Sequence, residues 1–220
     1  MTGTALGAEP EQLDPRTTEI LDRIKGVFAA KGFDGASMQD LARAAEMSAG
    51  NFYRYFPSKD AIIGAMVQRD LDRVAEEFAR VISAASPRAA LVEVIRNRLE
   101  TTGAEEGALW AEIEAAATRR PEIAQMHERM EAEIIRYLGR VFALIAGIAP
   151  EAAANRFAAQ SQLILLMVKG TAVQSCGAGR CTVMRPSAEL HALVLRIVDQ
   201  ILAEAAPQHA GQSGTTEGRE

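Results

Sequence analysis

Apolar residues recur at every third or fourth position along most of this chain. That spacing is typical of amphipathic α-helices, whereas strands alternate apolar and polar residues. The clearest stripe lies within residues 59–83 and consists of Ile63, Val67, Leu71, Val74, Phe78 and Val81. No run of alternating β-branched residues bounded by turns is found. The pattern therefore predicts an all-α fold.

Serines, glycines and prolines divide this pattern into about nine helices. A serine precedes several stripes and is a preferred N-cap, and Ser86-Pro87 reads as an N-cap followed by the first helical position. Gly32 suits the end of the first helix, and Phe33 is expected to fold back on Phe28. The predicted helices span about 15–31, 38–45, 49–55, 59–83, 87–101, 105–119, 121–145, 150–176 and 188–206.

Two of these helices are short and lie close together near the N-terminus. Residues 38–45 and 49–55 are capped by Ser37 and Ser48, and Pro57 ends the second helix. Two short helices joined by a three-residue turn form a helix-turn-helix, whose second helix places its N-terminal residues in the major groove of DNA. This stretch predicts a DNA-binding unit.

The residues of this unit add a family resemblance. The pattern S-x-G-x-x-Y-x-Y-F-x-x-K resembles the recognition helix of the TetR (tetracycline repressor) family of bacterial transcriptional regulators. It is carried by Ser48, Gly50, Tyr53, Tyr55, Phe56 and Lys59. The resemblance extends back over 20–33 and forward to about Met66. The family usually has glycine where this chain has Glu46, and a left-handed residue there costs about 1–2 kcal/mol without glycine.

The resemblance implies a ligand-responsive transcriptional regulator. Such a protein is expected to repress by binding a palindromic operator in double-stranded DNA as a homodimer, and to be released by a small, mostly apolar effector. The expected organisation is a three-helix head plus a helical bundle. Its parts are a disordered arm (1–14), a helix-turn-helix domain (15–60) joined by a helix to about 83, a ligand-binding and dimerisation domain (84–206), and a disordered tail (207–220).

Side-chain chemistry suggests how the head meets DNA. The Asn51 amide suits adenine, and Tyr53 offers a ring to thymine methyls and a hydroxyl to phosphate. We assign Tyr55, Lys59 and Ser37 to phosphates. The alternative for both tyrosines is packing of the rings with hydroxyls in water. The predicted DNA-binding residues are Ser37, Ser48, Ala49, Gly50, Asn51, Tyr53, Arg54, Tyr55 and Lys59. Phe52 and Phe56 are expected in the core.

The last two predicted helices carry wide apolar faces. Residues 163–168 are apolar all round, and a helix that is apolar on two sides must be covered on two sides. A large monomeric core and a four-helix dimer interface both satisfy this, and the resemblance favours the dimer, as does the prevalence of two-fold homodimers. The predicted interface residues are Leu163, Leu166, Leu190, Leu193, Val194, Ile197 and Ile201.

An effector pocket is expected, by resemblance, among the helices between residues 87 and 176. Its candidate lining residues combine apolar bulk with a few polar groups. They are Trp110, Ile113, Met126, His127, Met130, Tyr137, Phe142, Gln160 and Met167. The alternative for each of them singly is an ordinary place in the core.

Charge changes the picture in one respect. The chain of 220 residues has a net charge of −5, but residues 16–59 contain seven basic and five acidic residues, so the rest carries −7. DNA contact is therefore expected to be local to the head. No leader and no apolar run of about 20 residues is found, which predicts a cytoplasmic protein without a membrane span.

Motifs for other chemistry are missing from the sequence. It has three histidines and no metalloprotease, Walker or nucleophile-elbow motif, so neither an enzyme nor a metal or cofactor site is predicted. Cys176 and Cys181 could form a disulfide on oxidation, but a cytoplasmic compartment keeps thiols reduced. The rival interpretation is a helical ligand-binding or adaptor protein whose head no longer binds DNA.

Overall fold

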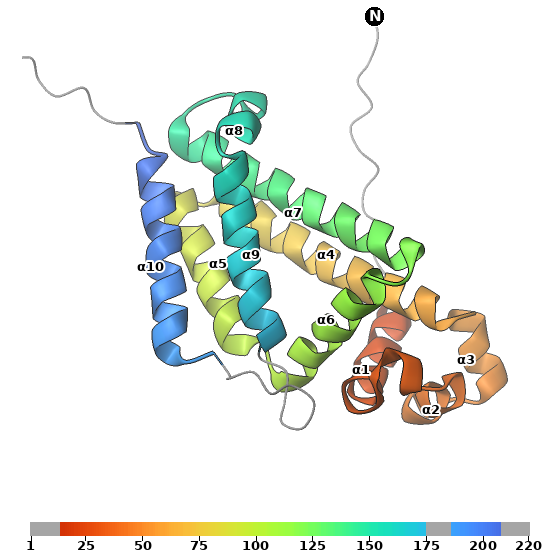
Figure 1. The fold of residues 1–220 in the computed structure, drawn as a ribbon. Coiled ribbons are helices and arrows are strands. Elements are labelled where there is room, and N and C mark those ends of the chain that lie inside the picture. The colour runs from red at the N-terminus through yellow and green to blue at the C-terminus, as the bar shows by residue number, and fades with distance from the viewer. Residues whose placement is uncertain (1–13, 175–185, 208–220) are drawn as a thin grey trace, which may run out of the picture.

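The computed structural model describes residues 14–174 and 186–207, which form ten α-helices and no strand (Figure 1). The all-α prediction is confirmed. The helices are α1 (Pro15–Gly35), α2 (Met38–Ala44), α3 (Ala49–Tyr55), α4 (Lys59–Ser83), α5 (Pro87–Thr101), α6 (Ala104–Ala117), α7 (Pro121–Ala146), α8 (Pro150–Arg156), α9 (Ala158–Gln174) and α10 (Ala188–Glu204).

Serine caps define where five of these ten helices begin. The Ser37, Ser48, Ser58, Ser86 and Ser187 side chains each accept a hydrogen bond from the backbone N–H three residues further on. Gly32 has a φ of 71° and interrupts α1, and the Phe33 ring stacks on Phe28 with centroids 5.9 Å apart. The predicted ending of the first helix is thus confirmed, although one more helical turn follows Gly32.

The single helix predicted over 150–176 was wrong. Phe157 leaves helical geometry at φ −111° and ψ 22°, so α8 ends at Arg156 and α9 begins at Ala158. The Phe157 ring is buried and stacks on Phe142 at a centroid distance of 4.7 Å. Because this contact joins Phe157 to a residue of α7, the periodicity within residues 150–176 did not indicate the break.

The helices build two adjoining apolar cores. The head core joins α1, α2 and α3 to the first half of α4 and to the facing parts of α6 and α7. The body core joins the second half of α4 to α5, α8, α9, α10 and the C-terminal half of α7. Figure 1 shows α1–α3 grouped at one end of the molecule, with α4 and α7 running side by side from there into the body. Helix α4 therefore contributes to both cores.

Several expectations concern residues that the structure does not describe. The arm at 1–13, the tail at 208–220, and Cys176 with Cys181 lie outside the described residues. Within the described ranges, no helix combines the length and apolar character that a bilayer crossing requires.

Candidate DNA interface and effector cavity

Helix α3 is held by two aromatic anchors and presents its other residues to solvent. Phe52 and Phe56 are buried in the head core, as predicted, with ring centroids 5.7 Å apart. The exposed residues of α3 and its cap are Ser48, Ala49, Gly50, Asn51, Tyr53, Arg54 and Tyr55. Tyr53 is 48% exposed and Tyr55 39% exposed, which is unusual for rings of this size. Seven of the nine predicted DNA contacts therefore share one open surface.

The turn before α3 contains a strained residue. Glu46 has a φ of 56°, the left-handed conformation that favours glycine. Its carboxylate accepts a hydrogen bond of 2.7 Å from Arg23 Nη1 on α1. The Met47 N–H donates to the Ala42 carbonyl at 2.9 Å and closes the turn. The turn between α2 and α3 therefore forms without a glycine at position 46.

Ser37 is exposed but already has partners. Its hydroxyl donates to Asp40 at 2.7 Å and accepts from the Asp40 N–H at 3.1 Å, while the Asp40 carboxylate accepts from the Ser37 N–H. This is a complete capping box. Hydrogen bonds from Lys31 and Ser37 hold the pKa of the Asp40 carboxyl well below its usual range. The start of α2 is consequently fixed, and Ser37 adds an exposed hydroxyl beside it.

Lys59 lies in a different setting from the exposed residues of α3. Its Nζ donates to the carbonyl oxygens of Phe33 at 2.8 Å and Asp34 at 3.2 Å, and lies 5.0 Å from the centre of the Phe33 ring. The ammonium thereby binds carbonyls at the end of α1. Because an ammonium has three N–H groups, one of them is not used by these two bonds.

Residues of α6 and of the turn between α6 and α7 hold the same end of α1 by a hydrogen bond and ion pairs. Arg120 pairs with Asp34 at 3.0 Å and with Asp60 at 2.8 Å, and its guanidinium lies 4.6 Å from the centre of the Phe33 ring. The Phe33 N–H donates to Glu112 Oε2 at 2.7 Å. These five residues form the head clamp. Sequence reasoning missed it because its hydrogen-bonded pairs lie 60–86 positions apart.

A cavity of about 100 Å³ opens in the body between α4, α5, α6, α7 and α9. Its wall is largely apolar and includes Val74, Phe78, Ile95, Ile134, Leu138 and Val168. An engineered apolar cavity of roughly 150 Å³ in another protein admits benzene, so the space is of the order needed for a small molecule. Of the predicted lining residues, Trp110, His127 and Met130 border this cavity.

The other six predicted lining residues lie elsewhere. Phe142 stacks on Phe157, Tyr137 stacks on Phe78 at 5.2 Å, and Met126 packs against Gly64. Ile113 is buried in the head core. Gln160 and Met167 are not part of the cavity wall, where α9 instead contributes Ile164, Leu165, Val168, Lys169, Ala172 and Val173.

One end of the cavity holds a buried ion pair that was not predicted. Arg98 Nη2 donates to both Asp70 oxygens, at 3.0 and 2.8 Å, and Arg73 also binds this carboxylate. Burial raises the pKa of Asp70, but the charges of Arg98 and Arg73 outweigh it and place the pKa below its ordinary value. The carboxylate therefore stays ionised inside an apolar wall.

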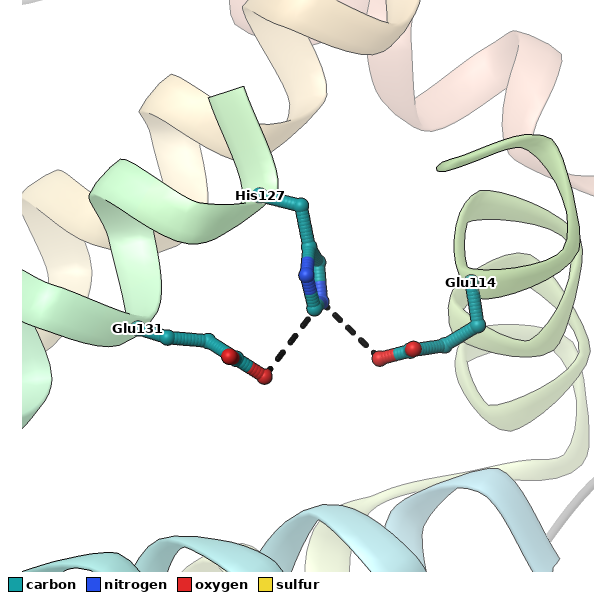
Figure 2. Close-up of side chains that lie close together, drawn as sticks. All are labelled: Glu114, His127 and Glu131. Atoms are coloured by element: carbon teal, nitrogen blue, oxygen red, sulfur yellow. Dashed lines mark ion pairs between the residues drawn. The ribbon is translucent and has the colours of Figure 1, made fainter. Parts of the chain in front are cut away.

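A second polar group, the Glu–His–Glu cluster of Glu114, His127 and Glu131, faces the cavity from α6 and α7. His127 Nε2 lies 2.9 Å from Glu114 Oε1 and 3.8 Å from Glu131 Oε1 (Figure 2). Lys169 on α9 reaches the same two oxygens, at 2.8 Å from that of Glu114. Burial lowers the pKa of Lys169, but hydrogen bonds to Glu114 and Glu131 outweigh it, so the pKa is raised. His127 and Glu131 stand four residues apart on one helix face, a spacing that could have indicated the contact.

The predicted dimer residues divide into two groups. Leu163 and Leu166 on α9, with Leu190 and Leu193 on α10, are large apolar side chains exposed by 36–63%. Val194 was predicted as an interface residue, and within a single chain its side chain is 5% exposed and lies in the body core. Ile197 and Ile201 are half-buried. Four exposed leucines on two helices form an apolar face.

The fold and the exposed, doubly anchored α3 define a helix-turn-helix protein with an all-α body. The family model described as "Bacterial regulatory proteins, tetR family" matches residues 20–66. The HTH-type transcriptional regulator UidR of Escherichia coli K12 is 29% identical over 130 residues, 59% of this chain and 65% of the relative. The HTH-type transcriptional repressor Rv1474c of Mycobacterium tuberculosis is 33% identical over 89 residues, 40% of this chain and 43% of the relative.

Solved structures agree with these sequence matches. Salmonella enterica GusR superposes with a TM-score of 0.64 at 26% identity, covering 86% of this chain and 96% of that one. Residues 20–66 of the chain thus match the tetR family of bacterial regulatory proteins, and the relatives found by sequence are HTH-type transcriptional regulators. The sequence match of the chain spans about 65% of the length of UidR, somewhat less than two thirds.

Proposed function

We propose that this protein is a transcriptional repressor that binds a palindromic DNA operator as a homodimer and releases it when a small, mostly apolar effector enters the body. The observation that carries the proposal is the surface of α3, where every residue except Phe52 is exposed. A short helix that buries one face on its own domain and leaves its N-terminal side open has the geometry of major-groove readers. Binding to chromosomal DNA also fits a cytoplasmic location.

Within this proposal the contacts differ in kind. Gly50 and Asn51 stand at the start of α3 and read base edges, while Tyr53 and Tyr55 supply exposed rings and hydroxyls. Lys59 keeps one N–H for a phosphate and uses the others on α1, so its replacement would disturb the head as well as the DNA contact. Ser37 marks the start of α2, where backbone N–H groups favour an anion.

The apolar face on α9 and α10 supports the homodimer. Leu166 is 63% exposed, and burying such a side chain contributes about 1.5–3 kcal/mol. Two copies related by a two-fold axis bury the same leucines against each other. Each copy then presents one α3, and the half-sites of the operator lie about 34 Å or a multiple of that apart.

A route from the cavity to the head supports the effector response. Helix α6 carries Trp110 and Glu114 at the cavity and Glu112 in the head clamp. Arg120, the N-cap of α7, belongs to the clamp, and α7 itself carries His127 at the cavity. An effector that separates these two helices would move the residues that hold Phe33. Only a ligand with different affinities for the two arrangements changes DNA binding.

Selection of bound sequences from random double-stranded DNA tests the DNA-binding part. We expect enrichment of a palindrome by the wild type and its loss in Tyr53→Ala, while Asn51→Ala changes the preferred bases. Selection that enriches no sequence with the folded wild type would favour the adaptor interpretation instead.

Sedimentation equilibrium tests the homodimer. The wild type is expected to sediment with twice the mass of one chain at micromolar concentration, and Leu166→Glu as a single chain. The matched control is Leu144→Glu, because Leu144 is 49% exposed but lies on α7 outside the α9–α10 face. Monomeric wild type at these concentrations would refute the dimer.

A further inference from the structure

The Glu–His–Glu cluster has more polar chemistry than an apolar effector requires. One atom each from Glu114, His127 and Glu131 lie within 4.8 Å of one another, two of the separations being 2.9 and 3.8 Å. Bonds from zinc to histidine nitrogen and carboxylate oxygen measure roughly 2.0–2.2 Å. At tetrahedral angles such bonds place the ligand atoms about 3.3–3.6 Å apart. The two separations from His127 Nε2 are each within about 0.5 Å of that spacing, and the third is at most 4.8 Å.

The state of His127 is an independent observation. The residue is only 7% exposed, and among the described residues its Nε2 has no hydrogen-bond partner. Glu114 Oε1 is close to Nε2 but does not lie in the direction that a hydrogen bond requires. Figure 2 shows the two carboxylates approaching the tip of the ring from opposite sides. A buried nitrogen without a partner is costly, and a ligand between the carboxylates would satisfy it.

Charge points to the kind of ligand. The two carboxylates carry −2, and the ammonium of Lys169, which binds both, supplies +1 beside an apolar wall. A divalent cation would balance both carboxylates. Lys169 binds the same two oxygens, which makes its ammonium and a metal ion alternative occupants. Its side chain is 27% exposed, and a long lysine can turn its ammonium to solvent.

We propose that Glu114, His127 and Glu131 form a binding site for a first-row divalent transition-metal ion, and that Lys169 holds the site with its ammonium when the metal is not bound. Imidazole nitrogen and carboxylate oxygen are ligands that Zn²⁺ and its neighbours accept. His127 and Glu131 lie one turn apart on α7 and Glu114 lies on α6. The ion therefore ties α6 to α7 and releases Lys169 on α9.

Titration of the metal-free, full-length protein with Zn²⁺ by calorimetry tests the site. We expect one ion per chain, and a loss of affinity of about 10–100-fold or more in Glu114→Gln and in Glu131→Gln. His191→Gln is the matched control, because His191 Nε2 also has no partner among the described residues yet belongs to no such cluster there. The double variant Cys176→Ser, Cys181→Ser controls for thiolate binding, and both controls should bind as the wild type does.

Lys169→Met separates a metal site from a structural ion cluster. Removing the competing ammonium should tighten Zn²⁺ binding by roughly tenfold. This variant keeps every proposed ligand, so it remains informative even if a glutamate variant fails to fold by circular dichroism. The site is refuted if wild type and Lys169→Met bind no more Zn²⁺ than the double variant Glu114→Gln, Glu131→Gln. Because these titrations contain no DNA, such a result would leave the proposed repressor function untouched.

Discussion

The head core and the body core are built on opposite principles. The head core closes around fully buried rings such as Phe28, Phe33 and Phe52. In the body, a cavity separates the apolar side chains and its wall contains Asp70, Arg98 and His127. Among the described residues, the buried polar side chains other than Thr17 lie on α4, α7 and α9 rather than on α1–α3.

This difference separates rigidity from responsiveness. An apolar core packed without charges holds its surface helix in one pose, which α3 needs in order to read a groove. Buried charges contribute little net stability but are costly to leave unpaired, so their arrangement changes when a partner arrives. The body is thus the part in which the proposed effector would select between conformations.

Removal of a head-core ring should have the largest effect. We expect Phe52→Ala to lower the free energy of unfolding by about 3–5 kcal/mol, because Phe52 is fully buried. Urea denaturation followed by circular dichroism measures it. The neighbouring Tyr53→Ala is the control and should stay within about 0.5 kcal/mol of the wild type while losing DNA affinity. Equal destabilisation by the two variants would contradict the anchoring of α3.

Breaking the buried ion pair of the body should come next. Asp70→Asn leaves Arg98 without its carboxylate and should cost about 3 kcal/mol. The control is Asp199→Asn, which breaks a half-exposed pair with Arg88 and should cost at most about 1 kcal/mol.

The same variant has a distinct pH signature. The folded pKa of Asp70 lies below the unfolded value of about 3.9, so its contribution is present above that pH and is lost as the pH falls through the folded pKa. We therefore expect the wild type to lose more stability than Asp70→Asn between about pH 5 and pH 2. Parallel curves for the two proteins would exclude this role.

Relief of the strained turn should raise stability modestly. Glu46→Gly is expected to add about 1 kcal/mol, because glycine adopts a φ of 56° without the steric cost that glutamate bears. Glu46→Ala keeps the strain and loses the exposed pair with Arg23, so it should be no more stable than the wild type. Thermal denaturation distinguishes them, and a glycine variant that melts with the alanine variant would show that the turn is not strained.

The smallest change in global stability is expected at the head clamp. Arg120→Ala removes two half-exposed ion pairs and should cost less than about 1 kcal/mol. Amide hydrogen exchange at Phe33 should nevertheless become faster, because this corner of α1 loses its hold on the body. Arg119→Ala, which removes a more exposed pair with Asp34, serves as the control. If amide hydrogen exchange at Phe33 is unchanged in both variants, the head clamp does not connect the cavity to the head.

Local rules explain what the sequence predicted well. The bounds of α3, α4 and α5 agree with prediction because a serine cap and a nearby stop signal lie within the same short stretch. Glu46 adopts the left-handed conformation, with a φ of 56°, that was considered for this position because the resembled family usually has glycine there.

Contacts distant in sequence explain the failures. The end of α8 depends on the stacking of Phe157 on Phe142, and the pairing of Asp70 with Arg98 joins residues 28 positions apart. Neither contact produces a periodic pattern of apolar residues in the sequence. Lys59 shows a subtler limit, because an ammonium suits a phosphate and a backbone carbonyl equally well, and only the fold brings the Phe33 carbonyl within 2.8 Å.

Helix α4 links the two cores mechanically, because it contributes side chains to both. Its 25 residues make a rod of about 37 Å, with Met66 seated in the head core and Phe78 in the body core. A tilt of about 10° pivoting at the body end would swing the other end by about 6 Å, roughly the width of a minor groove. In the proposed two-fold pair both rods would swing, so a small rearrangement around an effector would be magnified into a mismatch with the pitch of the double helix.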